Sequence, residues 1–284
     1  EMVMKNSQRN SILCPNCRKL ISRDESRCPH CGILAPGTAW KQWSTIFFKN
    51  PENLIRFIVW SNIGMYLISL VYSGRSVGFN FNPFGLLSPD NNSLMLLGAT
   101  GTIIINNSQQ WWTLLSANYL HGSVLHILFN MMALMQLAPV TIHEYGAKRT
   151  FVIYTIGGVL GFFISYIAGV RLTIGASAAV CALIGALLYY GKSRSGTYGQ
   201  AIYRQVFGWA LGIFIFGYLV PGINNWGHGG GMLAGALLGF LLGYQDKKKE
   251  NILHKMLASV CIFSTIAILF FSIIRAGLFL FASS

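Results

Sequence analysis

The chain has 284 residues, of which 53% are hydrophobic and 10% are charged, with a mean hydropathy of +0.51. Soluble domains average about 25% charged residues, so this composition excludes an ordinary soluble domain and indicates a membrane protein. The formal net charge of +13 raises the alternative of nucleic-acid binding, which depends on where the basic residues lie.

Residues 1–33 are polar and contain four of the six cysteines. These four form two C-x-x-C motifs separated by ten residues, and Gly32 follows the second motif. Four thiolates in this arrangement suit tetrahedral zinc, and glycine readily adopts the positive φ of a tight knuckle. Two disulfides or four free thiols are the alternatives, but a cytosolic location disfavours disulfides. We therefore predict a structural Zn²⁺ bound by Cys14, Cys17, Cys28 and Cys31.

The module at residues 1–33 resembles zinc-ribbon knuckles that are attached to many unrelated bacterial proteins, and its sequence identifies no partner. Residues 34–52 are expected to form a linker with an aromatic, basic segment suited to the lipid–water interface, although an ordinary linker fits equally well. No cleavable signal peptide is expected, because the first fifty residues are polar and contain cysteines.

Seven apolar segments approach or exceed the ~18 residues that a membrane-spanning helix requires. Their expected ranges are 54–72, 123–143, 151–170, 173–190, 206–220, 226–244 and 257–281. A long loop rich in Gly, Asn, Pro and Ser separates the first two segments, and part of it is expected in the membrane interface.

Basic residues are distributed unevenly between the two sides of the membrane. If the spans alternate in direction, only Arg75, Arg171 and Arg275 lie opposite the amino terminus. Cytosolic loops carry the excess of Lys and Arg, so we expect a multi-pass cell-membrane protein with a cytosolic amino terminus. This topology explains the net charge, and we expect no nucleic-acid partner.

A serine and a histidine interrupt the fourth and sixth spans. Ser177 follows Gly175, and His228 is followed by glycines at four-residue spacing, beginning with Gly231 and Gly235. Small-residue faces allow close helix packing, which would bring the serine within hydrogen-bonding reach of the histidine, as a nucleophile and its base require. A serine alone is usually a packing residue in such helices, whereas a polar pair inside lipid indicates a functional site.

The second span adds further polar groups. His126 and Asn130 are four residues apart on one helical face, and both can donate hydrogen bonds to an oxyanion. His121 is expected to hold the preceding loop against the span. Asn130 lies about 10 Å below the outer face at the rise of an α-helix, and Ser177 and His228 lie a few residues from the same face. The site is therefore expected to open to the extracytosolic side.

Other intramembrane chemistries do not fit the sequence. Position 147 is alanine, so the His143-Glu144 pair does not extend to an H-E-x-x-H zinc site. The three aspartates, Asp24, Asp90 and Asp246, lie outside the expected spans, which excludes a buried aspartyl pair.

With these residues together, the chain resembles the rhomboid family of intramembrane serine proteases from about residue 53 to residue 244. The resemblance rests on the H-x4-H-x3-N pattern of His121, His126 and Asn130, on Gly175-Ala-Ser177, and on His228 with its glycines. It implies an all-α polytopic fold with a six-helix core at 53–244. A cytosolic loop and a seventh transmembrane helix would follow at 245–284, and a small cytosolic zinc ribbon would precede the core.

The resemblance also implies a mechanism without a catalytic cofactor. Ser177 would attack the scissile carbonyl and His228 would take its proton, while His126, Asn130 and backbone N–H groups near Ser177 hold the oxyanion. The substrates would be transmembrane segments of other proteins, admitted laterally from the lipid bilayer.

The sequence departs from the family pattern at three positions. Thr113 follows Trp112 where the family has arginine, Ile142 stands in place of a glutamate, and Cys181 replaces an aromatic residue that often stacks on the histidine. The leading interpretation is an intramembrane serine protease. The alternatives are a rhomboid-like pseudoprotease that binds membrane clients without cleaving them, and a zinc-ribbon scaffold whose membrane part is only an anchor.

Overall fold

The computed structural model describes residues 10–38, 50–79 and 85–283. Most of the segment predicted to lie in the membrane interface lies outside these residues. The chain divides into two compact units between residues 54 and 55, and each is described by itself.

The first unit contains a two-stranded antiparallel sheet of β1 (Ser11–Leu13) and β2 (Leu20–Ser22). The first C-x-x-C motif forms the turn between the strands, where the Cys14 N–H donates to the carbonyl of Lys19 over 2.9 Å. Gly32 follows the second motif, and its φ of +72° confirms the expected conformation. Among the described residues of this unit, the buried hydrophobic cluster consists of Cys14, Ile21 and Cys28. So small a core requires additional stabilisation, which a metal or disulfides typically provide.

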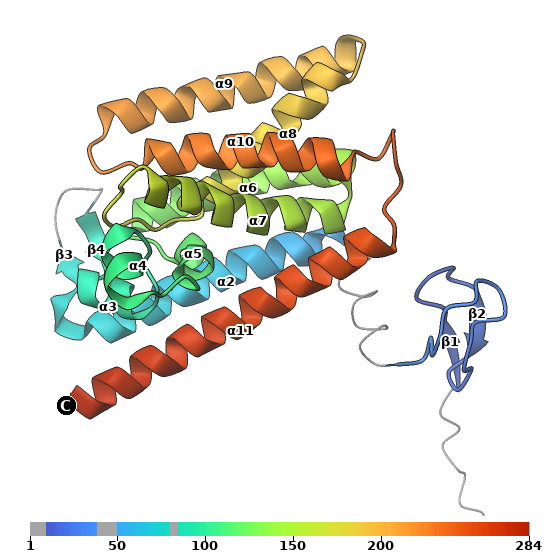
Figure 1. Ribbon diagram of the computed structural model, residues 1–284, viewed down its shortest axis with the longest axis horizontal. Coiled ribbons are helices and arrows are strands. Elements are labelled where there is room, and N and C mark those ends of the chain that lie inside the picture. The colour runs from blue at the N-terminus through green and yellow to red at the C-terminus, as the bar shows by residue number, and fades with distance from the viewer. Residues whose placement is uncertain (1–9, 39–49, 80–84, 284) are drawn as a thin grey trace, which may run out of the picture. The chain divides into compact units, whose positions relative to one another are not determined.

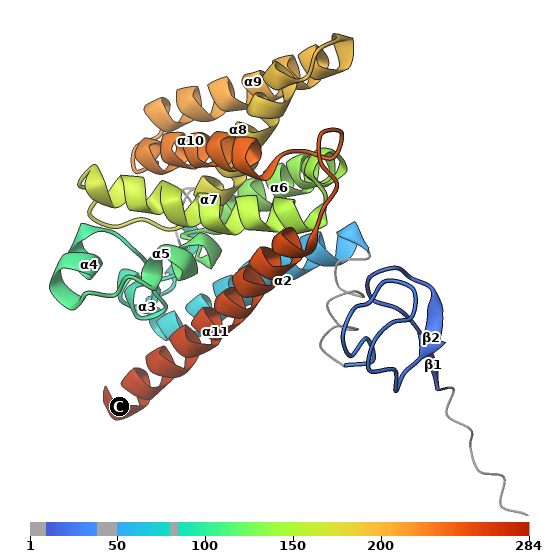
Figure 2. The same ribbon diagram turned by 45° about the vertical axis from the view of Figure 1, so that its right-hand side comes forward.

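The second unit is helical, and its long helices run side by side (Figures 1 and 2). They are α2 (Pro51–Ser73), α6 (Val124–Tyr145), α7 (Ala147–Ile167), α8 (Ser177–Ser193), α9 (Thr197–Leu219), α10 (Asn225–Leu242) and α11 (Ile252–Ser283). Helix α8 contacts α6, α7, α9 and α10, and it is therefore the central helix of the unit.

A long connection, residues 74–123, joins α2 to α6. Its elements are η1 (Gly74–Ser76), β3 (Gly78–Phe79), β4 (Leu86–Ser88), α3 (Asn91–Leu96), α4 (Thr102–Ser108), α5 (Thr113–Ser116) and η3 (Ala117–Tyr119). The connection pairs with the segment that precedes α8, because Thr100 and Thr173 exchange two backbone hydrogen bonds of 3.1 and 2.7 Å.

The predicted all-α polytopic architecture is confirmed. Among the described residues, five helices are long and apolar enough to cross a membrane, including the C-terminal one. They span Glu52–Ser76, Val124–Tyr145, Ala147–Ile167, Thr197–Leu219 and Ile252–Ala282. The other two expected spans correspond to α8 and α10, which have 17 and 18 residues. The chain is thus a multi-pass membrane protein.

Four of the expected starts, at residues 151, 173, 206 and 257, differ from the structure by four or more residues, and two of these differences have identifiable reasons. The fourth span was expected from residue 173, but α8 begins only at Ser177, because Thr173 pairs with Thr100 in extended conformation. The fifth span was expected from residue 206, but α9 begins at Thr197. Its first turns contain the polar residues Gln200 and Arg204. These residues lower the local hydropathy, so a search for apolar segments misses the start of the helix.

The N-terminus of α7 is held by the loop between α10 and α11. The Glu250 carboxylate accepts hydrogen bonds from the backbone N–H groups of Lys148 and Arg149, at 2.8 and 3.1 Å. The fully buried guanidinium of Arg149 donates to the carbonyls of Gly243 and Lys248. A carboxylate at a helix N-terminus is favourable because it meets unpaired donors and the positive end of the helix dipole.

Helices α8 and α10 approach so closely that their backbones touch. A Cβ atom at Gly235 would overlap the carbonyl oxygen of Ala182, and one at Gly231 would overlap that of Ala178. The contact is reciprocal, because a Cβ atom at Gly185 of α8 would overlap the carbonyl oxygen of Met232. Only glycine at these positions permits the observed separation.

We predict that Gly235→Ala lowers the free energy of unfolding by about 1–3 kcal/mol, because the added methyl group must push α8 and α10 apart. Thermal unfolding of the full chain in detergent measures the effect. Gly64→Ala in α2 is the matched control, since a Cβ atom there meets nothing within 4 Å. Equal unfolding midpoints for the two variants would show that the α8–α10 contact tolerates a side chain.

Candidate active site

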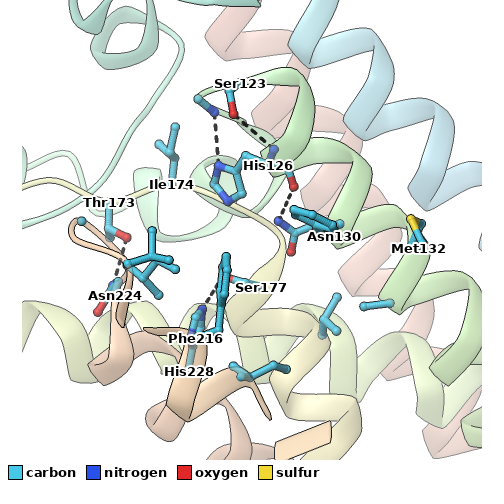
Figure 3. A pocket seen from close by; sticks show the side chains of 18 of the residues that line it. Ser123, His126, Asn130, Met132, Thr173, Ile174, Ser177, Phe216, Asn224 and His228 are labelled. Atoms are coloured by element: carbon cyan, nitrogen blue, oxygen red, sulfur yellow. Dashed lines mark hydrogen bonds between the residues drawn. The ribbon is translucent and has the colours of Figure 1, made fainter. Parts of the chain in front are cut away.

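Ser177 and His228 form a hydrogen-bonded pair where α8 and α10 begin (Figure 3). The Ser177 Oγ lies 2.9 Å from the His228 Nε2. His228 is 7% exposed, and its Nδ1 has no hydrogen-bond partner among the described residues. The imidazole can therefore accept the serine proton through Nε2, without a carboxylate bound to its other nitrogen.

The segment that leads into α8 at Ser177 passes close to His126 at Gly175. Its φ is +121°, and a Cβ atom on it would lie 2.6 Å from the His126 Nε2. A larger residue would thus be strained in its backbone and would collide with the imidazole. The Gly175 N–H donates to the carbonyl of Ala117 over 2.9 Å, which fixes this segment to the α2–α6 connection.

His126 directs one ring nitrogen toward the serine. Its Nδ1 accepts a hydrogen bond of 3.3 Å from the Gly122 N–H, so the neutral ring has its proton on Nε2, the nitrogen nearest Gly175. The fully buried His121 ring lies against the His126 ring, with 5.0 Å between their centroids. These contacts orient His126 as a donor to the space beside Ser177.

Asn130 lies one turn along α6 from His126. Its Nδ2 donates to the carbonyl of His126 over 2.9 Å. Because a primary amide has two N–H bonds, a second donor remains for another acceptor. Figure 3 shows Asn130 and His126 projecting from α6 into the same space as Ser177 and His228.

These four side chains line one cavity of about 940 Å³ between α6 and α9. Its wall also includes apolar residues of both helices, among them Phe129 and Phe216. Cys181 is fully buried and does not line the cavity. The departure from the family pattern at this position therefore changes packing beneath the serine and leaves the cavity wall intact.

Asn224 was missed by sequence reasoning, although it connects three parts of the site. Its Oδ1 accepts from the Gly227 N–H over 2.9 Å and so caps α10. Its Nδ2 donates to the Ser165 Oγ and the Thr173 Oγ1, at 2.8 and 2.9 Å. An asparagine just before an apolar helix is a recognisable cap, but its bonds to α7 and to the segment before Ser177 are long-range.

The four N-terminal cysteines form a separate cluster. Their sulfur atoms all lie within 4.8 Å of one another, with 3.6 Å between Cys14 and Cys31 and between Cys17 and Cys28. Hydrogen bonds from the Ile33 N–H and the Asn16 side chain lower the pKa of the Cys31 thiol to about 6. Four sulfurs at these separations can bind one metal ion, since tetrahedral Zn–S bonds of about 2.3 Å place the ligands just under 4 Å apart.

A family model described as the rhomboid domain matches residues 108–245. RHOMBOID-like protein 7 of Arabidopsis thaliana is 27% identical over 229 residues, which cover 74% of this chain and 69% of that protein. RHOMBOID-like protein 5 of the same plant is 31% identical over 206 residues, covering 65% of each chain. Rhomboid protease GluP of Bacillus subtilis (strain 168) is 30% identical over 156 residues, covering 55% of this chain.

The matched regions span only part of these relatives. They cover 69% of RHOMBOID-like protein 7, 65% of RHOMBOID-like protein 5 and 31% of the GluP protein. The match to the family model, which begins at residue 108, lies wholly within the helical unit.

We predict that Asn224→Ala lowers the free energy of unfolding by about 1–2 kcal/mol, because it removes the helix cap and two further hydrogen bonds. Asn224→Asp retains the capping acceptor and loses the two donated bonds, so it should fall between wild type and alanine. Denaturation in detergent compares them with Asn225→Ala, a neighbour whose Oδ1 has no partner among the described residues. Identical stability of Asn224→Ala and wild type would refute this role.

Proposed function

Because the chain belongs to the rhomboid family, we propose that it is an intramembrane serine protease. It hydrolyses peptide bonds in or near transmembrane segments of other membrane proteins. The observation that carries the proposal is the 2.9 Å hydrogen bond between Ser177 and His228 in the wall of a cavity within the helical unit. Their pairing supports a nucleophile activated by an adjacent base.

The proposed reaction proceeds through an acyl-enzyme. The Ser177 Oγ attacks the scissile carbonyl carbon while the His228 Nε2 takes the hydroxyl proton. The resulting imidazolium gives this proton to the leaving amine as the C–N bond breaks. A water molecule, deprotonated by His228, then attacks the ester and restores Ser177 and a carboxyl terminus.

Donors around the serine support stabilisation of the oxyanion. The N–H groups at the start of α8 lack intrahelical acceptors and lie at the positive end of its dipole. The His126 Nε2–H and the second Asn130 N–H add side-chain donors on the α6 side of the cavity. In a site that excludes water, each such donor contributes a factor of about 10²–10³ to the rate.

The position of the cavity supports a transmembrane segment as substrate. It lies between α6 and α9 and has an apolar wall, so an unwound apolar segment entering between these helices would reach Ser177 from the lipid. The distribution of basic residues supports a cytosolic amino terminus, with the active site opening to the extracytosolic side.

The cysteine cluster is proposed to hold a structural Zn²⁺. Cys14, Cys17, Cys28 and Cys31 would be its ligands, and the ion would stabilise the small first unit whose hydrophobic core is minimal. No catalytic step involves it.

We predict that the purified chain, reconstituted in liposomes, cleaves a transmembrane substrate, and that Ser177→Ala lowers kcat by at least about 1,000-fold. Asn130→Ala should lower kcat on the order of 100-fold, as expected for one oxyanion donor. Ser264→Ala in α11 is the serine control and should cleave normally. Binding of the substrate by the wild-type chain without Ser177-dependent cleavage would instead support a pseudoprotease.

We predict that the full chain purifies with about one zinc ion per molecule. Elemental analysis of the purified protein measures this content. Cys28→Ser should lose most of the zinc because three thiolates bind it more weakly, whereas Cys261→Ser in α11 should retain it. Equal zinc in the two variants, or none in the wild-type chain, would contradict the proposed ligand set.

A further inference from the structure

Trp112 lies in the connection between α2 and α6 and is followed by a threonine. The family's arginine at this position is replaced by Thr113, whose side chain is fully buried. The Thr113 Oγ1 hydrogen-bonds to the Thr100 Oγ1 at 3.0 Å and to the carbonyl of Gln110 at 2.6 Å. Position 113 is therefore part of the packed interior of the connection and has no space for an arginine.

An arginine reaches Trp112 from the seventh helix instead. The guanidinium carbon of Arg275 in α11 lies 5.7 Å from the centre of the indole ring, within cation–π range. Its Nη1 also donates to the carbonyl of Leu96 over 3.3 Å, at the end of α3. Arg275 thus contacts two separate parts of the α2–α6 connection.

A second residue on the same face of α11, Phe271, also contacts Trp112. Phe271 is one helical turn before Arg275, and its ring meets the indole edge-on at 90°, with 5.3 Å between the centroids. The indole also packs on Gly98, where a Cβ atom would lie 2.5 Å from the Trp112 Cζ3. The tryptophan is therefore fixed between α11 and the backbone of its own connection.

Hydrogen bonds connect the residues near Trp112 to the segment just before Ser177. Thr113 binds Thr100, and Thr100 pairs with Thr173 through two backbone hydrogen bonds. The carbonyl of Ala117, one residue past α5, accepts from the Gly175 N–H. Thr100 and Ala117, whose backbones bind Thr173 and Gly175 in the segment before Ser177, thus both belong to the connection that Arg275 and Phe271 hold.

We propose that Arg275 is a positioning residue for the active site. Through Trp112, the seventh helix fixes the α2–α6 connection, and the connection fixes residues 173–175 directly before Ser177. The effect on catalysis rests on the proposed protease function, whereas the effect on the connection does not. Arg275 also lies on the side of the membrane that is predicted to have few basic residues, so its charge has a role apart from topology.

The proposal is tested on the full chain in detergent with Arg275→Met and Arg275→Lys. Arg75→Met is the matched control, because it removes an exposed arginine predicted to lie on the same side of the membrane. Hydrogen–deuterium exchange reports the order of each segment, and cleavage of a transmembrane substrate gives kcat and KM separately.

In Arg275→Met we expect faster exchange at residues 97–117 and 171–176, with unchanged protection in α7, α8 and α10. We also expect kcat to fall roughly tenfold with little change in KM, as loss of a half-buried cation–π contact would produce. Arg275→Lys should be intermediate, and Arg75→Met should match the wild-type chain.

Three results would overturn the proposal: unchanged exchange in both segments, equally faster exchange in all helices, or the same effect from Arg75→Met. If the wild-type chain cleaves nothing, the protease function fails, but the exchange experiment still decides whether Arg275 holds the connection.

Discussion

The backbone contact between α8 and α10 is the constraint on which the rest of the site depends. Helices in lipid gain little from the hydrophobic effect when they associate, so close packing at small residues must hold them together. Gly231 and Gly235 bring α10 onto the carbonyl groups of α8. Ser177 and His228 lie at the adjacent starts of these helices, and a small increase in the helix separation would break their 2.9 Å hydrogen bond.

Around this contact, the polar ends of the helices are held by groups from other parts of the chain. Asn224 caps α10 and binds Thr173, and the α2–α6 connection pairs with the segment before Ser177. Because the site is assembled at helix ends, its donors include backbone N–H groups that an uninterrupted spanning helix would use internally. This assembly also explains why α8 is shorter than a typical spanning helix.

The central residues of the site were predictable because they occur in a recognisable combination. A serine after Gly175, a histidine followed by spaced glycines, and two donors four residues apart are visible in the sequence without any knowledge of the fold. The structure brings Ser177, His228, His126 and Asn130 to one cavity. The helices were predictable from hydropathy, except where polar residues conceal the start of α9.

The groups that support the site were not predictable, because their partners are distant in the sequence. Arg275 is 179 residues from Leu96, and Glu250 is about 100 residues from the start of α7. Hydropathy reports burial along the chain and carries no information on such pairings. The departure at Thr113 looked like a loss for the same reason. Arg275 of α11 lies against the neighbouring Trp112 instead.

The reactivity of Ser177 tests the central claim most directly. The purified chain is treated with a fluorophosphonate, and the modified residue is identified by mass spectrometry of its peptides. An activated serine predicts a single phosphonylated residue, Ser177, with labelling lost in His228→Ala although that variant remains folded. An unlabelled Ser177 in the folded wild-type chain, or equal labelling in His228→Ala, would contradict the account.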